Sequence, residues 1–289
     1  MYINIIEYLL QNIMNHIKLH LSKLLTLAII LMAFAGFCAC NDTPEEPATV
    51  AGYTNLEDLD GHSVGVVTGS TMDVMLSDSD NFPFITIMRY RTPSELIKAV
   101  QNGTADCGIT DTVQLMTLSL EKHGLAIDFN LPGGFDVAAA FKQKDEKLCQ
   151  QFNDFIAQLK SDGTIDTMMS RWCSAKMDTV AMPQFPELAN LKGHPLEVAT
   201  LADNEPFSFY RDNTWTGFEV ELMLRFSISI GRPVHFSGYT FDEILSTLLT
   251  NKADIACADL FITPDRSNRV LYSTPYYFCK TSCFSKAKN

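Results

Sequence analysis

Hydrophobic and polar positions change their period repeatedly along most of the chain. Short apolar runs such as HSVGVV at 62–67 alternate with segments such as PSELIKAVQN at 93–102, where apolar residues recur every three to four positions. After residue 194 the same succession restarts with LEVATL at 196–201 and a helical pattern at 216–231. Alternating strands and helices are typical of α/β domains with parallel sheets. The pattern therefore predicts two α/β units in one chain.

Two segments between these units break the strand–helix alternation. Residues 145–173 have the pattern of two consecutive helices, and residues 174–194 contain two prolines and little periodicity. We interpret the second segment as a linker, because such composition is typical of irregular connections. The predicted organisation is one unit at 55–137 and a second at 138–289. The second unit comprises the closing helices, the linker and a core at 195–289.

A short internal repeat links the two units. The segments AVQNGTADCGITD and LLTNKADIACAD each enter a strand through Ala-Asp and carry a second aspartate five residues later. The first aspartates of the two copies are Asp106 and Asp254, and the second are Asp111 and Asp259. We expect Asp106 and Asp254 to serve structure at the start of their strands. The repeat predicts that both units follow one α/β plan.

Polar residues gather where ligands bind in this class of fold. Open α/β sheets bind ligands outside the carboxyl ends of their strands, where backbone N–H groups are free to bind anions. Two such corners occur, TGST at 68–71 and DLFIT at 259–263, and the second leads into Arg266. A guanidinium group can hold a carboxylate through two parallel hydrogen bonds. Asp111, at the end of a strand, would accept from an ammonium group. Together they predict a clamp for a zwitterion.

Two longer blocks and three shorter ones carry a resemblance to a known family. PLEVATLADNEPFSFYRDNTWTGFEVELM and NKADIACADLFITPDRSNRVLYSTPYYF resemble the opening lobe of the bacterial extracellular solute-binding proteins of the amino-acid-binding type, family 3. LEDLDGHSVGVVTGSTMD, NGTADCGITDTVQL and DGTIDTMMSRWC resemble the parts that normally follow, yet here they come first. The resemblance covers roughly residues 55–285. It implies an α/β, two-lobed periplasmic-binding-protein type II fold (a Venus-flytrap) in circularly permuted order. We expect one covalent crossing between the lobes, near 135–141, where the family usually has two.

The resemblance also implies roles for single residues. Arg266 would hold the ligand α-carboxylate, and Asp111 the α-amino group. An aromatic residue, Phe241, would pack on the ligand side chain. The turn after a strand of the first unit would donate amides and a hydroxyl; its residues are Gly69, Ser70 and Thr71. Each of these residues also has a structural alternative: Arg266 as a surface arginine, Asp111, Ser70 and Thr71 as helix caps, and Phe241 as a core residue.

Several positions depart from the family pattern. Asn204 stands where the family usually has an aromatic residue, and Phe261 where it usually has a hydroxyl residue that shares the carboxylate. Asp259 replaces a small residue. An added aspartate would either pair with Arg266 or suit a more cationic ligand. These departures concern the ligand rather than the fold.

The N-terminal segment has the pattern of an export signal. Lys18 and Lys23 precede the apolar run LLTLAIILMAFAGF, which is short for a bilayer span and ends in small residues before Cys40. This order is typical of a secretory signal, and a cysteine after it is typical of a lipoprotein. We predict a signal peptide at 1–39, lipidation at Cys40 and an acidic tether at 40–54. An uncleaved anchor helix is the alternative, which the short run disfavours.

Charge and cysteine spacing exclude some classes of function. The chain has 22 basic and 34 acidic residues and a net charge of −12, which argues against a nucleic-acid partner because such binding needs a basic face. No cysteine or histidine spacing typical of a metal site occurs, and no cofactor is expected.

The predicted function is a lipid-anchored, extracytoplasmic solute-binding protein of the cell envelope. It would be a monomer that takes a small zwitterion, an amino acid or a related compound, for uptake by an ABC-type permease. One alternative is an enzyme of the same fold, a dehydratase of prephenate or arogenate. The other is a sensing module that uses the same lobes without transport. The lack of a recognisable catalytic set favours binding over catalysis.

Overall fold

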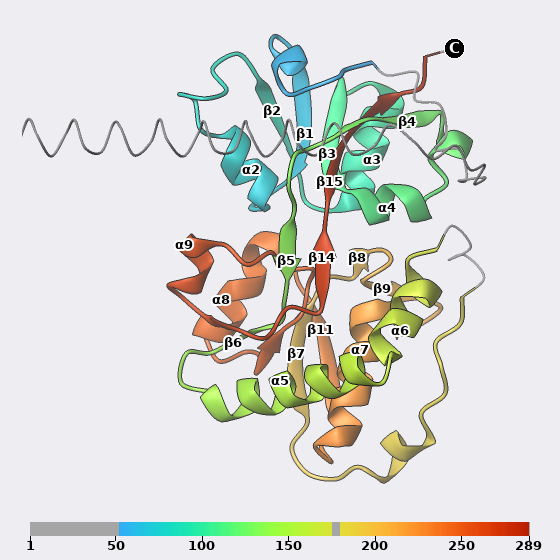
Figure 1. Ribbon diagram of the computed structural model, residues 1–289, viewed down its shortest axis with the longest axis vertical. Helices are drawn as coiled ribbons and strands as arrows, with labels where there is room; N and C mark the ends of the chain where they lie inside the picture. Colours follow the sequence, from blue (N-terminus) through green and yellow to red (C-terminus); the bar gives the residue numbers. More distant parts are fainter. Residues whose placement is uncertain (1–51, 175–179, 289) are drawn as a thin grey trace, which may run out of the picture. The chain divides into compact units, whose positions relative to one another are not determined.

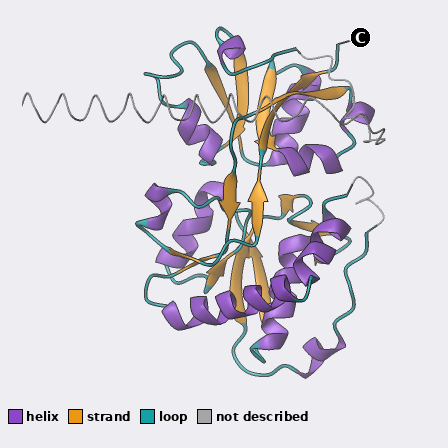
Figure 2. Ribbon diagram, in the orientation of Figure 1, coloured by secondary structure: helices purple, strands orange, loops and turns teal. Residues whose placement is uncertain are grey.

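Residues 52–174 and 180–288 are described by the computed structural model of the protein. The predicted signal peptide, Cys40 and nearly all of the tether lie outside these residues. Within the described part, none of the helices has the length and apolar character needed to cross a membrane. The described residues form two α/β lobes, each built on a five-stranded sheet with flanking helices (Figures 1 and 2). The prediction of two α/β lobes is therefore confirmed.

Lobe A contains the sheet with the strand order β2-β1-β3-β15-β4. Strand β1 runs parallel to β2 and β3, whereas β15 runs antiparallel to β3 and β4. Its elements are η1 (Glu57–Leu59), β1 (Ser63–Val67), α2 (Thr71–Leu76), β2 (Thr86–Tyr90), α3 (Pro93–Asn102), β3 (Cys107–Asp111), α4 (Thr112–Thr117), η2 (Leu120–His123), β4 (Leu125–Asn130) and β15 (Thr281–Lys286).

Lobe B contains the sheet with the strand order β11-β7-β12-β6-β13 and a smaller sheet, β10-β9-β8. Its elements are β6 (Ala140–Phe141), α5 (Glu146–Ser161), α6 (Thr164–Trp172), η4 (Pro186–Asn190), β7 (Leu196–Thr200), β8 (Asp203–Asn204), β9 (Ser208–Arg211), β10 (Thr214–Thr216), α7 (Phe218–Ser229), β11 (Val234–Gly238), η5 (Phe241–Glu243), α8 (Ile244–Leu249), β12 (Ile255–Ala256), α9 (Pro264–Ser267) and β13 (Leu271–Tyr272).

The helix boundaries follow local sequence signals. Helix α3 begins after Thr92, whose side chain accepts from the backbone N–H of Glu95 at 3.2 Å, and it ends at Gly103 in the left-handed conformation. Threonine caps and a following proline favour a helix start, and glycine favours its end. Helix α9 begins in the same way, at Thr263 and Pro264. Both helices therefore begin at a threonine cap followed by proline.

The closing helices predicted at 145–173 are present as α5 and α6. One face of α5 is buried, and its Phe152 packs edge-to-face on Phe226 of α7 with ring centroids 4.9 Å apart. Beside them, the fully buried carboxylate of Glu221 accepts from Arg171 and from the indole of Trp172, at 2.6 and 2.7 Å. These contacts attach both helices to lobe B, because an unpaired buried carboxylate would cost several kcal/mol.

The chain crosses between the lobes twice. Strands β5 (Phe135–Val137) and β14 (Tyr277–Cys279) pair antiparallel and lie side by side between the two large sheets (Figure 1). After β14 the chain enters lobe A, where β15 inserts between β3 and β4. The expectation of one crossing is therefore wrong, and residues 281–286 do not join the sheet of the core at 195–289. Strand–helix alternation does not indicate which sheet a strand will join.

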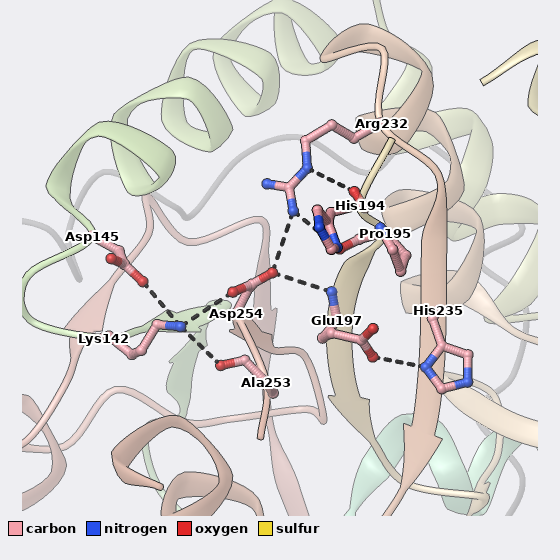
Figure 3. Close-up of polar contacts among 9 residues, drawn as sticks. All are labelled: Lys142, Asp145, His194, Pro195, Glu197, Arg232, His235, Ala253 and Asp254. Atoms are coloured by element: carbon pink, nitrogen blue, oxygen red, sulfur yellow. Dashed lines mark hydrogen bonds and ion pairs between the residues drawn. The ribbon is translucent and has the colours of Figure 1, made fainter. Parts of the chain in front are cut away.

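The internal repeat has the same structure in both lobes. Asp106 accepts from the backbone N–H of Ser63 at 2.8 Å, at the start of β1. Asp254 accepts from the backbone N–H of Glu197 at 3.3 Å, at the start of β7, and also binds Lys142 and Arg232 (Figure 3). Each aspartate thus fastens the strand that it begins to the neighbouring strand. Their expected structural role agrees with these contacts.

Candidate functional site

A small cavity of about 60 Å³ lies between the lobes. Its wall comes from the ends of β3 and β12, the start of α2, and the segments around β8 and η5. Seven of the nine predicted ligand-binding residues line it, namely Ser70, Thr71, Asp111, Asn204, Phe241, Asp259 and Phe261. The other lining residues are Val67, Met72, Pro93, Ile109, Thr110, Gln114, Leu201 and Thr281.

The two aspartates that close the internal repeat meet in this cavity. Asp111 ends β3 of lobe A, and Asp259 follows β12 of lobe B. Both are buried, with 5% and 7% of their surface exposed. Burial raises the pKa of both carboxyl groups, and the charge of Asp111 raises the pKa of Asp259 further. Two close carboxyl groups in a buried site favour a shared proton or a bound cation, since both cannot easily carry a negative charge.

Glu219 of α7 holds the backbone of Asp259 in place. The N–H of Asp259 donates to both carboxylate oxygens of Glu219, at 2.8 and 3.0 Å, and the hydroxyl of Tyr276 donates to the same carboxylate. Burial raises the pKa of Glu219 to about 7. These contacts fix Asp259 at a φ of +52°, a conformation that non-glycine residues seldom adopt. No local sequence signal distinguishes Glu219, which is one polar position in a helical pattern.

A hydrogen-bonded chain connects the lobes along one side of the cavity. Thr110 donates to the side-chain oxygen of Gln114, and the amide nitrogen of Gln114 donates to the side-chain oxygen of Asn204, each at 2.5 Å. Gln114 belongs to lobe A and Asn204 to lobe B. The amide group of Asn204 therefore has a fixed orientation, with its nitrogen left to bind something else. Gln114 was also missed, because nothing local in the sequence marks a contact between lobes.

Four polar side-chain atoms on the cavity wall have no hydrogen-bond partner among the described residues. They are Thr71 Oγ1, Asp111 Oδ2, Asn204 Nδ2 and Asp259 Oδ1. Leaving a buried polar group unpaired costs about 1–3 kcal/mol, more for a charged group. A small molecule that pairs with these atoms would remove that cost. The cavity therefore has the features of a ligand site.

Arg266 lies outside this cavity. Its guanidinium donates to the backbone carbonyls of Phe261 and Gly69, at 3.2 and 3.1 Å, and lies 5.2 Å from the ring centroid of Phe241. Together with Gly69 it lines a neighbouring cavity, which Phe241 and Thr71 separate from the first. The possible pairing of Asp259 with Arg266 does not occur. In its place, Arg266 connects the backbones of the two lobes.

The turn at the start of α2 is occupied by its own contacts. The hydroxyl of Ser70 accepts from the N–H of Asp73 at 3.1 Å, and the N–H of Gly69 donates to the carboxylate of Asp73 at 2.8 Å. Ser70 thus caps the helix, which was the structural alternative for this residue. Phe261 stacks on Phe135 of the crossing strand with ring centroids 4.6 Å apart.

Comparison with known proteins matches the last third of the chain to one family. Residues 196–289 match the model of the bacterial extracellular solute-binding proteins, family 3. A putative ABC transporter arginine-binding protein of Escherichia coli K12 is 34% identical over 28% of this chain and 34% of its own length. A probable histidine-binding protein of Campylobacter jejuni is 29% identical, over 32% of this chain and 36% of its own length.

A third relative extends the match somewhat further. A putative amino-acid ABC transporter-binding protein of Vibrio harveyi is 30% identical over 42% of this chain and 49% of its own length. The chain thus spans between about a third and a half of the curated relatives that it matches. The family match covers most of lobe B together with β14 and β15, and so includes the segment that contributes Asn204, Phe241 and Asp259 to the cavity.

Proposed function

We propose that this chain, whose residues 196–289 match the bacterial extracellular solute-binding proteins, family 3, captures a small, positively charged, amino-acid-like solute between lobes A and B. The observation that carries the proposal is the meeting of Asp111 and Asp259 in the cavity. Each has a buried oxygen without a partner among the described residues. A cationic group between them would donate to both carboxyl groups and balance the negative charge of one, while the other keeps a proton.

The names of the relatives agree with this charge preference. Two of the matched proteins are described as binding arginine and histidine. Both of these amino acids can carry a cationic side chain. The cavity of this chain provides carboxyl groups from opposite lobes, so one bound cation would contact both lobes at once. Ligand capture would then stabilise the closed arrangement, as in hinge closure around a ligand.

The crossing strands are suited to such a motion. Within residues 52–174 and 180–288, only β5 and β14 connect the lobes covalently, and they pair over three residues. Direct contacts supplement them, including the hydroxyl of Ser94, which donates to Asp203 at 2.5 Å. Closure would form these polar contacts, and opening would expose the cavity.

We further propose the cellular setting that follows from the family. The chain would be exported, anchored through a lipid on Cys40 and monomeric, and it would pass its ligand to an ABC-type permease. The segments of its lobes would follow a circularly permuted order along the chain, in which the segments that come later in the family come first. The blocks quoted from the sequence and the position of β15 beside β3 support this order. Sensing without transport remains the alternative use of the same cavity.

Calorimetric titration of the full-length chain tests the proposal. Arginine, lysine and histidine are the ligands, and glutamate and leucine are the controls. We expect at least one basic amino acid or a close basic analogue to bind and glutamate to fail. Asp111→Asn should weaken binding at least tenfold, whereas Asp106→Asn, at the other end of the same strand, should not. Binding of glutamate in preference to every cation, or turnover of prephenate, would overturn the proposal.

A further inference from the structure

The charges on the cavity wall are all of one sign. Among the described residues that line it, Asp111 and Asp259 are the only charged side chains, and lysine, arginine and histidine are absent. A ligand carboxylate placed in this cavity would therefore lie near two buried carboxyl groups with no cation to balance it. Any negative charge that those carboxyl groups keep would repel the ligand carboxylate.

Most of the groups expected to bind a ligand carboxylate already have partners. The guanidinium of Arg266 donates to two backbone carbonyls, those of Phe261 and Gly69. The N–H of Gly69 donates to Asp73, and the N–H of Ser70 donates to the carbonyl of Val67 at 3.0 Å. Phe261 has no hydroxyl to offer. Among the described residues, the hydroxyl of Thr71 is the one side-chain group of this predicted set that lacks a partner.

The unpartnered atoms describe a different ligand. Asp111 Oδ2 and Asp259 Oδ1 lack donors unless the two carboxyl groups share a proton. Asn204 Nδ2 requires an acceptor, and Thr71 Oγ1 can donate or accept. Asn204 is 98% buried, since only 2% of its surface is exposed, and Gln114 fixes its orientation. A cationic head with several N–H groups satisfies the two carboxyl groups. A neutral oxygen or nitrogen further along the same molecule satisfies Asn204.

We propose that Asp259 selects an organic amine rather than an α-amino acid: the ligand head is an ammonium or guanidinium group, clamped between Asp111 and Asp259, with no carboxylate on the adjacent carbon. This inference rests on the proposed function and narrows its ligand class. Asp111 supplies one of the two carboxyl groups that hold the ligand head. Asp259 supplies the other and makes the site prefer an amine over an α-amino acid. Glu219 acts as a positioning residue, because it holds the backbone of Asp259 at its unusual φ.

Three matched pairs of ligands test this selection with the full-length chain. They are agmatine with arginine, cadaverine with lysine, and histamine with histidine, each measured by calorimetric titration. Within the pair that fits the cavity, we expect the amine to bind at least tenfold more tightly than its parent amino acid. Asp259→Asn should remove most of that preference. Asp259→Gly should do the same without strain, because glycine readily adopts a φ of +52°.

The internal repeat provides a matched control. Asp254 belongs to the same segment as Asp259 but lies at the opposite end of β12, where it binds Lys142, Arg232 and the backbone of Glu197 (Figure 3). Asp254→Asn should keep the preference for the amine. Tighter binding of the amino acid within each pair, or an amine preference that survives both substitutions of Asp259, overturns the inference and leaves the proposed function standing. If neither member of any pair binds, both fall.

Discussion

At the scale of single residues, the cavity wall depends on a buried group of acids. Glu219 accepts from the backbone of Asp259 and from the hydroxyl of Tyr276, and Asp259 in turn faces Asp111 across the cavity. Cys257 lies beside the same tyrosine, with its sulfur 3.6 Å from the hydroxyl oxygen. The network has many acceptors and few cations, so protons or a cationic ligand must balance its charge.

The raised pKa of Glu219 predicts a pH dependence of stability. The folded protein keeps the proton of Glu219 up to a pH of about 7, whereas the unfolded chain loses it near 4.5. The native state binds more protons in this window, so the free energy of unfolding should fall as pH rises, by at most about 1.4 kcal/mol per pH unit for this group. Asp111 and Asp259, whose pKa values burial also raises, act in the same direction.

Urea denaturation of the wild type and of Glu219→Gln at pH 5 and pH 7 measures this effect. The glutamine keeps an acceptor for the N–H of Asp259 but cannot ionise. We expect the wild type to lose more stability between the two pH values than the variant does. Equal losses, or a wild type that gains stability toward pH 7, would show that Glu219 does not hold the proton.

Seven of the nine predicted site residues line the cavity because their positions follow from a local rule. Asp111 and Asp259 lie at the carboxyl ends of their strands, where ligands bind in open α/β sheets. Arg266 could not be placed by the same rule. Its long side chain reaches carbonyls on two other segments, Phe261 and Gly69, and only the packed structure decides between those and a ligand.

At the scale of elements, the start of α7 determines where Glu219 lies. The first amides of this helix, those of Phe218 and Glu219, donate to the carbonyls of Pro206 and Phe207 at 3.0 and 2.8 Å. Gly217 precedes them with a φ of +125°, and a Cβ there would overlap the carbonyl oxygen of Phe207. Only glycine therefore allows the helix to approach this closely.

Gly217→Ala should destabilise the fold by about 2–3 kcal/mol, because the backbone strain and the lost amide contacts act together. Gly231, at the other end of α7, also has a positive φ, of +67°, but nothing lies within 4 Å of the place its Cβ would take. Gly231→Ala should cost only about 1 kcal/mol. Thermal or urea unfolding of both variants provides the comparison. Equal losses would contradict this account of the helix start.

The elements were predictable where the signals are local. Thr92 with Pro93 and Thr263 with Pro264 marked helix starts, and Gly103 marked an end. Strand β15 was not predictable in its place, because its partners β3 and β4 lie about 150–180 residues earlier in the chain. Long-range pairing is set by the packing of Cys283 and Phe284 into lobe A, both of which are fully buried.

At the scale of the whole molecule, the first and last described segments meet in lobe A. The N–H of Gly52 donates to Asp128 of β4 at 2.6 Å, and a Cβ on Gly52 would lie 3.0 Å from the hydroxyl of Ser285 in β15. Neighbouring ends are what a circular permutation requires. A short linker between these two ends would therefore be enough to reverse the proposed circular permutation.

A reordered chain tests the proposed permutation. It begins at residue 180, runs to 288, continues through a short glycine–serine linker to residue 52, and ends at 174. We expect the same far-ultraviolet circular dichroism and the same ligand preference. The free energy of unfolding should change by about 1 kcal/mol or less, because doubling a loop's length costs only about 0.6 kcal/mol. A reordered chain that fails to fold would contradict the proposed circular permutation.

The central claim is that two carboxyl groups from opposite lobes hold one cationic ligand head. A double-mutant cycle on the full-length chain, with Asp111→Asn, Asp259→Asn and the pair together, tests it through the dissociation constant of agmatine. The account predicts a loss of at least tenfold for each single variant. It also predicts that the double variant loses less binding free energy than the two single variants lose together, by about 1 kcal/mol or more, because both residues bind the same group. Losses that add within about 0.5 kcal/mol, or an affinity that neither substitution lowers, would contradict it.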